Sequence, residues 1–144
     1  MQKLSPVEDA KALMREAADW SVWNWLTQKS RLRSAADAAW EALEEQDRKV
    51  KARWSEDLKK AYQGRNSNHL DPDLKMAVQR VRAADEEWKT ARILAEATFD
   101  EADRRMSTTM ACEGAQQAIE AWELTEKAIR RAEALARRIS DYRA

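Results

Sequence analysis

The side chains best suited to acid–base or redox chemistry in this sequence are a single histidine and a single cysteine. His69 lies among Asn and Ser residues with no second His and no Cys nearby, so we expect an exposed turn residue and not a general base or metal ligand. Cys112 is followed by Glu113, whose carboxylate opposes ionisation of the thiol, so we expect Cys112 to fill space in the core. Neither residue therefore points to catalysis.

Carboxylates are plentiful and raise the question of a metal site. Di-iron bundles need Glu-x-x-His pairs, and the sequence contains none. Asp47 and Asp85 interrupt apolar stripes and, if buried together, could bind a cation or share a proton, but we expect both to reach water. A Gly-rich phosphate loop, a Cys-x-x-Cys pair and a nucleophile elbow are also absent. We therefore predict no catalytic residue, no cofactor and no metal, and a protein that is not an enzyme.

Tryptophan is the most unusual feature of the chain, which contains seven. Trp20, Trp23 and Trp25 lie close together, and Trp is enriched both at membrane interfaces and at binding hot spots. A helix lying on a membrane needs a basic polar face, whereas residues 16–28 contain no Lys or Arg. We favour a bundle core or a self-association interface, and a Trp-lined pocket remains an alternative.

The elements that would carry these residues are helices. Ser5-Pro6-Val7-Glu8 places a cap residue, a Pro and a Glu where a helix begins. No Pro or Gly follows before Gly64, so one helix is predicted over about residues 6–62.

A turn at residues 63–71 is rich in Asn, Ser and Gly. Asp71-Pro72 then repeats the cap-plus-Pro signal and predicts a second helix over about residues 72–141. Ser, Thr and Gly at residues 107–114 weaken this helix and predict a kink or break there.

These signals predict an all-α protein, a long antiparallel helical hairpin of two to three helices that pairs into a helical bundle. Residues 1–144 would form a single domain. If the turn pairs residue 62 with residue 72, the numbers of facing residues add to about 134, and large residues then face small ones as close packing requires. This match favours a second helix that runs on past residues 107–114.

Two regions carry more apolar surface than one hairpin can cover. In the first helix a second apolar stripe contains Leu13, Trp20 and Trp23. After residue 115 the stripe of the second helix, which contains Trp122 and Ile129, is rotated by about 140° from the stripe before it. Pairing of two hairpins would cover these faces, so we predict a homo-oligomer, with a dimer favoured.

Length and charge set the broad class of the protein. The 144 residues include 26 Lys+Arg and 26 Asp+Glu, and this zero net charge does not point to nucleic acid or a membrane. No apolar run reaches the length of a membrane span and no signal-peptide pattern is present, so we expect no membrane contact and a cytoplasmic protein. A single Cys excludes a disulfide framework.

Charge is nevertheless unevenly distributed. Residues 48–82 contain ten basic and four acidic side chains, whereas residues 37–47 and 83–103 contain twelve acidic and two basic ones. The predicted tip of the hairpin is therefore basic and would contact the acidic surface of a second copy or an acidic protein partner.

Together these patterns predict a helical scaffold or protein–protein interaction module that self-associates through Trp-rich apolar faces. The alternatives are a ligand-binding bundle with a Trp-lined pocket and, less favoured, a protein that contacts nucleic acid through the basic tip. The residues predicted to make the interactions are Leu13, Trp20, Trp23, Trp122, Ile129, Lys59, Lys60 and Arg65.

Overall fold

The computed structural model describes residues 5–62 and 72–143. These residues form four helices, α1 (Ser5–Ala17), α2 (Val22–Tyr62), α3 (Pro72–Arg105) and α4 (Thr108–Arg143), and no strand. The all-α prediction is confirmed, while the predicted count of two to three helices is too low. The predicted turn at 63–71, with His69 and Arg65, lies outside the described residues.

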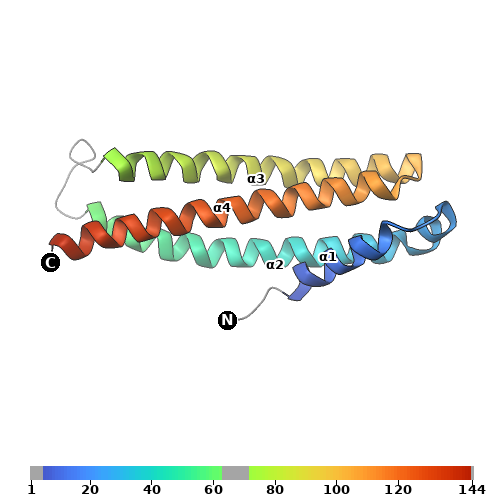
Figure 1. Cartoon of the computed structure of the whole chain (residues 1–144), viewed down its shortest axis with the longest axis horizontal. Helices are drawn as coiled ribbons and strands as arrows, with labels where there is room; N and C mark the ends of the chain where they lie inside the picture. The colour runs from blue at the N-terminus through green and yellow to red at the C-terminus, as the bar shows by residue number, and fades with distance from the viewer. Residues whose placement is uncertain (1–4, 63–71, 144) are drawn as a thin grey trace.

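The three long helices lie side by side along the long axis of the molecule, and α1 folds back over one half of α2 (Figure 1). Helices α2 and α4 run in one direction and α3 runs in the other (Figure 1). Helix α4 packs most extensively on α3, packs also on α2, and is touched by α1. It is therefore the central helix of the bundle.

The first break in the helices lies between Ala17 and Val22, inside the segment predicted as one helix over 6–62. The Trp20 N–H donates to the Ala17 carbonyl at 3.0 Å, which closes the end of α1. Helix α2 then begins with reciprocal capping: the Ser21 N–H donates to Asn24 Oδ1 at 3.0 Å, and the Asn24 N–H donates to Ser21 Oγ at 3.2 Å. These caps satisfy backbone groups that a continuous helix would have paired.

The second break is a full reversal of the chain at Met106 and Ser107. Met106 has a φ of 52°, the left-handed conformation that ends many helices. The Ser107 N–H donates to the Ala102 carbonyl at 2.9 Å, and Ser107 Oγ accepts the Met110 N–H at 3.2 Å to cap α4. The expectation that the second helix runs on past 107–114 was therefore wrong, and the segment 72–141 forms two antiparallel helices.

Small residues allow α3 and α4 to approach closely. A Cβ added to Gly114 of α4 would lie 3.1 Å from Cβ and Cγ2 of Thr98 in α3, closer than ordinary van der Waals contact. Further along, the Thr125 hydroxyl lies 3.0 Å from the Ala84 carbonyl of α3 and 3.0 Å from the Ala121 carbonyl of its own helix. Large side chains at these positions would push the two helices apart.

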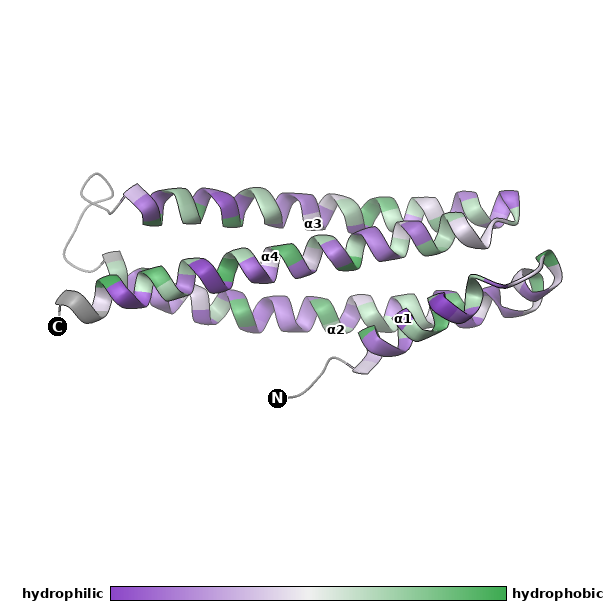
Figure 2. Ribbon diagram, in the orientation of Figure 1, coloured by the Kyte–Doolittle hydropathy of each residue, from purple (hydrophilic) through white to green (hydrophobic). Residues whose placement is uncertain are grey.

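Three apolar clusters fill the bundle along its length. Near the ends at residues 62 and 72, Trp54 packs with Leu74 and Ile129. In the middle, Trp40 lies 6.4 Å from Trp88 between ring centroids. Figure 2 shows that apolar and polar residues alternate along every helix.

The alignment of α2 with α3 agrees with the predicted hairpin. Ion pairs join Lys29 to Asp103 at 2.6 Å and Arg33 to Asp100 at 3.0 Å. Each pair lies within two residues of the alignment in which facing numbers add to about 134. Helix α3 nevertheless packs mainly on α4 and hardly on α2, so the predicted two-helix packing is replaced by a bundle in which α4 is the main partner of α3.

Candidate interaction surfaces

The structure divides the predicted interaction residues between the core and the surface. Leu13, Trp122 and Ile129 are buried, each in a different one of the three apolar clusters. Trp20 is half-buried against the cluster that contains Leu13. The reversal at Met106 and the break after Ala17 fold α4 and α1 back onto the bundle, so neighbouring helices of the same chain cover these faces.

Trp23 is different, because its side chain is 71% exposed. Val22 and Leu26 lie beside it in the first turns of α2 and are also exposed. We define the Trp23 patch as Val22, Trp23 and Leu26. Trp25, only two residues further on, is fully buried at 0% exposure and anchors the same turn in the core.

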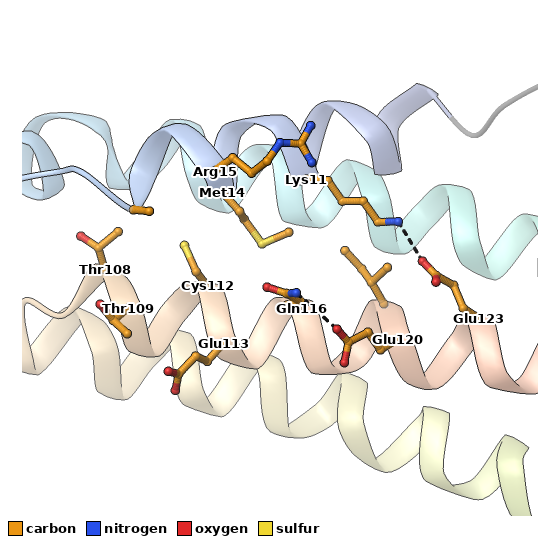
Figure 3. Close-up of a pocket in the computed structure, with 12 residues that line it drawn as sticks. Lys11, Met14, Arg15, Thr108, Thr109, Cys112, Glu113, Gln116, Glu120 and Glu123 are labelled. Atoms are coloured by element: carbon orange, nitrogen blue, oxygen red, sulfur yellow. Dashed lines mark hydrogen bonds and ion pairs between the residues drawn. The ribbon is translucent and has the colours of Figure 1, made fainter.

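A groove of about 530 Å³ separates α1 from α4 (Figure 3). Lys11 Nζ closes one end by pairing with Glu123 Oε1 at 2.8 Å. Met14 from α1 and Cys112 from α4 point into the space between the helices (Figure 3). The groove is therefore lined by both apolar and charged side chains.

The groups that line this groove are poorly suited to nucleophilic chemistry. Burial raises the pKa of the Cys112 thiol above its ordinary value, which keeps it protonated near pH 7. The nearest carboxylate in sequence, Glu113, also lines the groove, and no His lines it.

Asp47 and Asp85 come together, and a lysine ammonium lies between them. Lys51 Nζ is 2.9 Å from Asp47 Oδ2 and 2.6 Å from Asp85 Oδ1, while Lys89 Nζ is 3.0 Å from Asp85 Oδ2. Burial opposes ionisation of Asp85, but hydrogen bonds from Lys51 and Lys89 outweigh it and hold the pKa of this carboxyl below its ordinary value. Burial likewise opposes the charge of Lys51, and its two carboxylate partners outweigh it and raise its pKa.

Replacing Lys51 by Met is expected to lower the free energy of unfolding by about 1–2 kcal/mol, because Asp47 then loses its ion-pair partner and faces Asp85, which keeps only Lys89. Lys51 is itself partly exposed, and solvent screening keeps the loss below that of a fully buried pair. Urea unfolding at pH 7 measures the difference.

The pH dependence of this loss follows from the pKa of Asp85. Since that pKa is lowered on folding, Asp85 contributes stability above its unfolded pKa and loses it as the pH falls through the folded pKa. The difference in the free energy of unfolding between the wild type and Lys51→Met should therefore become smaller below about pH 4. Lys49→Met is the matched control, because Lys49 is exposed and pairs only with Glu45 at 3.5 Å. If Lys51→Met and Lys49→Met lowered the free energy of unfolding equally, this would contradict the role of Lys51 as a bridge between the two carboxylates.

Glu133 of α4 is a buried carboxylate, 3% exposed, that ties α4 to α2. Arg53 donates Nε–H to Glu133 Oε2 at 2.7 Å and Nη2–H to Oε1 at 3.0 Å. Arg137 donates to Glu133 Oε2 at 3.2 Å and to Asp57 Oδ2 at 3.2 Å. The hydrogen bonds to Glu133 raise the pKa of Arg53 above its ordinary value.

The return of α4 concentrates positive charge at one end of the bundle. Residues 48–61, 72–82 and 124–140, which we define as the basic end, contain fourteen Lys/Arg and five Asp/Glu. Residues 5–47 and 83–123, the acidic end, contain nine Lys/Arg and nineteen Asp/Glu. Lys59 and Lys60 are exposed on the basic end. The sequence predicted this imbalance only in part, since it did not place α4 there.

A smaller groove of about 140 Å³ lies between α3 and α4 at the basic end. Arg80, Lys127 and Arg131 line it, and none of these has an ion-pair partner within the described ranges. Its remaining lining residues are apolar: Ala77, Ala128 and Leu124. We define these six residues as the basic groove. No sequence signal pointed to it, because it exists only where α4 lies back against α3.

Within the described part of the chain, Trp40 lines small cavities, two spaces of about 10 Å³ each. Ligand pockets typically measure about 300–1,000 Å³. A Trp-lined ligand pocket gains no support from these cavities.

Within the described residues, no group of three or more His, Cys, Asp or Glu is placed to hold a metal ion. None of the helices in this part of the chain has the length and apolar character that crossing a membrane requires. No protein-family model, curated protein or solved structure matches the chain. Its partners must therefore be inferred from its own surface.

Proposed function

We propose that this protein is a non-enzymatic helical scaffold that self-associates through the Trp23 patch. The exposed ring of Trp23 is the observation that carries the proposal, since a large aromatic side chain open to water gains free energy when a partner covers it. Clustered exposed apolar residues typically mark protein contact sites.

The Trp23 patch is held in a fixed shape. The Ser21–Asn24 caps define the start of α2, and the Thr27 hydroxyl donates to the Trp23 carbonyl at 3.0 Å. The ring of Trp25 anchors this turn from beneath, 5.5 Å from the Phe99 ring between centroids. A patch that is ordered before binding loses little further entropy when a partner docks.

Leu13, Trp122 and Ile129 are buried, so they are not part of the proposed contact surface. These side chains support the bundle, and the interaction is assigned to Trp23 and its two neighbours.

Light scattering on the purified chain tests the proposal. At micromolar concentration the mass should be at least twice 16.6 kDa, and Trp23→Ala should lower it towards the monomer. Ile93→Ala is the matched control, because Ile93 is a similarly exposed apolar residue on α3. A monomeric wild type, or an oligomer that persists in Trp23→Ala, would rule out this contact.

A further inference from the structure

We infer that two copies of this chain also associate through an exposed face of α4, with their α4 helices antiparallel. The contact surface is a row of six residues, which we define as the α4 stripe: Glu113, Gln117, Glu120, Leu124, Lys127 and Arg131. This contact is additional to the one proposed for the Trp23 patch and does not depend on it.

The α4 stripe is a continuous exposed face of the helix. Its members follow one another at steps of four and three residues, the spacing that keeps side chains on one side of a helix. All six are exposed, and Leu124 is 59% exposed. The side chains of α4 that pack on its neighbours, such as Thr125 and Ile129, lie outside the stripe. No helix among the described residues therefore covers it.

Charge changes sign along the α4 stripe. Glu113 and Glu120 precede Leu124, whereas Lys127 and Arg131 follow it. None of these four charged groups forms an ion pair with another described residue. Glu120 accepts one hydrogen bond, at 3.2 Å, from a neutral amide of its own helix. The four charges therefore remain available for a partner.

The adjacent surface of α3 repeats this order of charge. Arg80 lines the basic groove beside the two cations of the stripe. Glu87 follows Arg80 by seven residues, about two helical turns, and so lies on the same side of α3. Both side chains are exposed and have no ion-pair partner within the described ranges. Because α3 and α4 are antiparallel, the pair presents three cations followed by three carboxylates on one face.

This order of charge favours a second copy as the partner and determines its direction. If two stripes meet with their α4 helices antiparallel, the cations of each copy face the carboxylates of the other. The two Leu124 side chains then lie close to the twofold axis. A parallel arrangement would place like charges together, which repel. Nucleic acid fits this face less well, because its carboxylates would repel phosphate groups.

The contact is expected to be weak by itself. Exposed ion pairs contribute little to association, because water and salt screen them. Leu124 is the one large apolar residue of the stripe. We expect a dissociation constant of about 0.1–1 mM in low salt, so the Trp23 patch remains the main contact at micromolar concentration.

The Trp23→Ala variant isolates this contact, because it lacks the central residue of the Trp23 patch. Sedimentation equilibrium at about 0.5 mM protein in about 20 mM NaCl should show a substantial fraction of dimer. Raising the NaCl concentration to about 500 mM should lower the association constant at least about tenfold, since the contact depends on exposed charges.

Two charge reversals are then added to Trp23→Ala. The cation variant carries Lys127→Glu and Arg131→Glu, and the acid variant carries Glu113→Lys and Glu120→Lys. Each should self-associate at least about tenfold more weakly than Trp23→Ala, because like charges then face each other. All four reversals together keep the two halves of the stripe complementary. They should restore the association constant to within about threefold of the value for Trp23→Ala.

A matched control separates the α4 stripe from the charge of the whole molecule. Adding Lys60→Glu and Lys75→Glu to Trp23→Ala gives the same net charge as the cation variant, at exposed positions outside the stripe. This control should self-associate at least about tenfold more tightly than the cation variant. Equal association constants for the two would overturn the assignment to the stripe.

The outcomes distinguish this inference from the proposal on the Trp23 patch. If Trp23→Ala stays monomeric at about 0.5 mM in low salt, the α4 contact is overturned and the Trp23 contact still stands. If the wild type is monomeric at micromolar concentration but Trp23→Ala dimerises at the higher one, the Trp23 contact is overturned and the α4 contact is supported. No recovery with all four reversals would overturn the antiparallel arrangement. A monomeric Trp23→Ala that binds a single-stranded DNA oligonucleotide through Lys127 and Arg131 would instead assign these cations to nucleic acid.

Discussion

Replacing Trp25 by Ala is expected to lower the free energy of unfolding by about 3–5 kcal/mol. Its ring is fully buried and lies among Leu32, Phe99, Ala102 and Ala111 at the end of the bundle near the α3–α4 reversal. Removing it leaves a cavity that three different helices would have to close. Urea unfolding followed by circular dichroism measures the change.

Trp23→Ala is the matched control for this loss, since both substitutions remove an indole from the first turns of α2. Because Trp23 is mostly exposed, the free energy of unfolding of the Trp23→Ala variant should stay within about 0.5 kcal/mol of the wild-type value when both are measured on the monomer. Trp122→Ala should behave like Trp25→Ala, because Trp122 is buried in the central cluster. If Trp23→Ala destabilised the monomer as much as Trp25→Ala, the described orientation of this turn would be wrong.

The double variant Arg53→Ala and Arg137→Ala is expected to lose about 3 kcal/mol of stability. Both guanidinium groups hydrogen-bond Glu133, whose carboxylate is buried, and their removal leaves that charge unpaired in the bundle. Thermal or urea unfolding at pH 7 and low salt gives the difference.

A third substitution tests the cause of this second loss. Adding Glu133→Leu to the double variant removes the unpaired carboxylate and should recover most of the lost stability. Arg104→Ala with Arg105→Ala serves as the exposed control, because both arginines pair with Glu101 at the surface and should cost less than about 1 kcal/mol. No recovery with Leu at position 133 would show that packing of the arginine side chains, and not charge pairing, explains the loss.

Much of the architecture could be predicted from particular residues. Pro72 starts α3 and the cap signal at Ser5 starts α1, as expected from Pro and Ser at helix starts. The antiparallel directions of α2 and α3 followed from the short connection between them, whereas the expected match of large residues to small ones did not hold, since Trp40 lies against Trp88. These features depend on local chemistry, which the sequence displays.

The break after Ala17 was not predicted, and the reversal at Met106 was predicted only as a kink or break at residues 107–114 in a helix expected to run on; both have specific physical causes. Helices commonly end at a Gly in the left-handed conformation, but α3 ends at Met106, which carries no such signal. Gly114 is the Gly nearest to this reversal, and it lies inside α4 where it allows close contact with Thr98. At Ser21 the capping partner is Asn24, whereas the usual signature has Glu or Gln in that position.

These two breaks also determine what could be predicted of the candidate surfaces. With α1 and α4 folded back, Leu13, Trp122 and Ile129 become core, whereas the Trp23 patch stays exposed. The Trp cluster did lie in the segment that carries this exposed patch. The basic groove had no counterpart in the sequence, since its two walls are joined by the reversal at Met106.

The separation of charge along the bundle has a consequence for how the whole molecule behaves in solution. Helices of 34 to 41 residues extend about 50–60 Å, and although the net charge is zero, positive charge gathers at one end of the bundle while the excess negative charge lies in its middle, at residues 37–47 and 83–103. Such a molecule resembles a very large zwitterion. In nearly salt-free water its copies attract one another electrostatically, and small ions added to the solution shield that attraction. Solubility near the isoelectric point of about 6.6 should therefore rise with the first additions of salt, the salting-in behaviour of a dipolar ion.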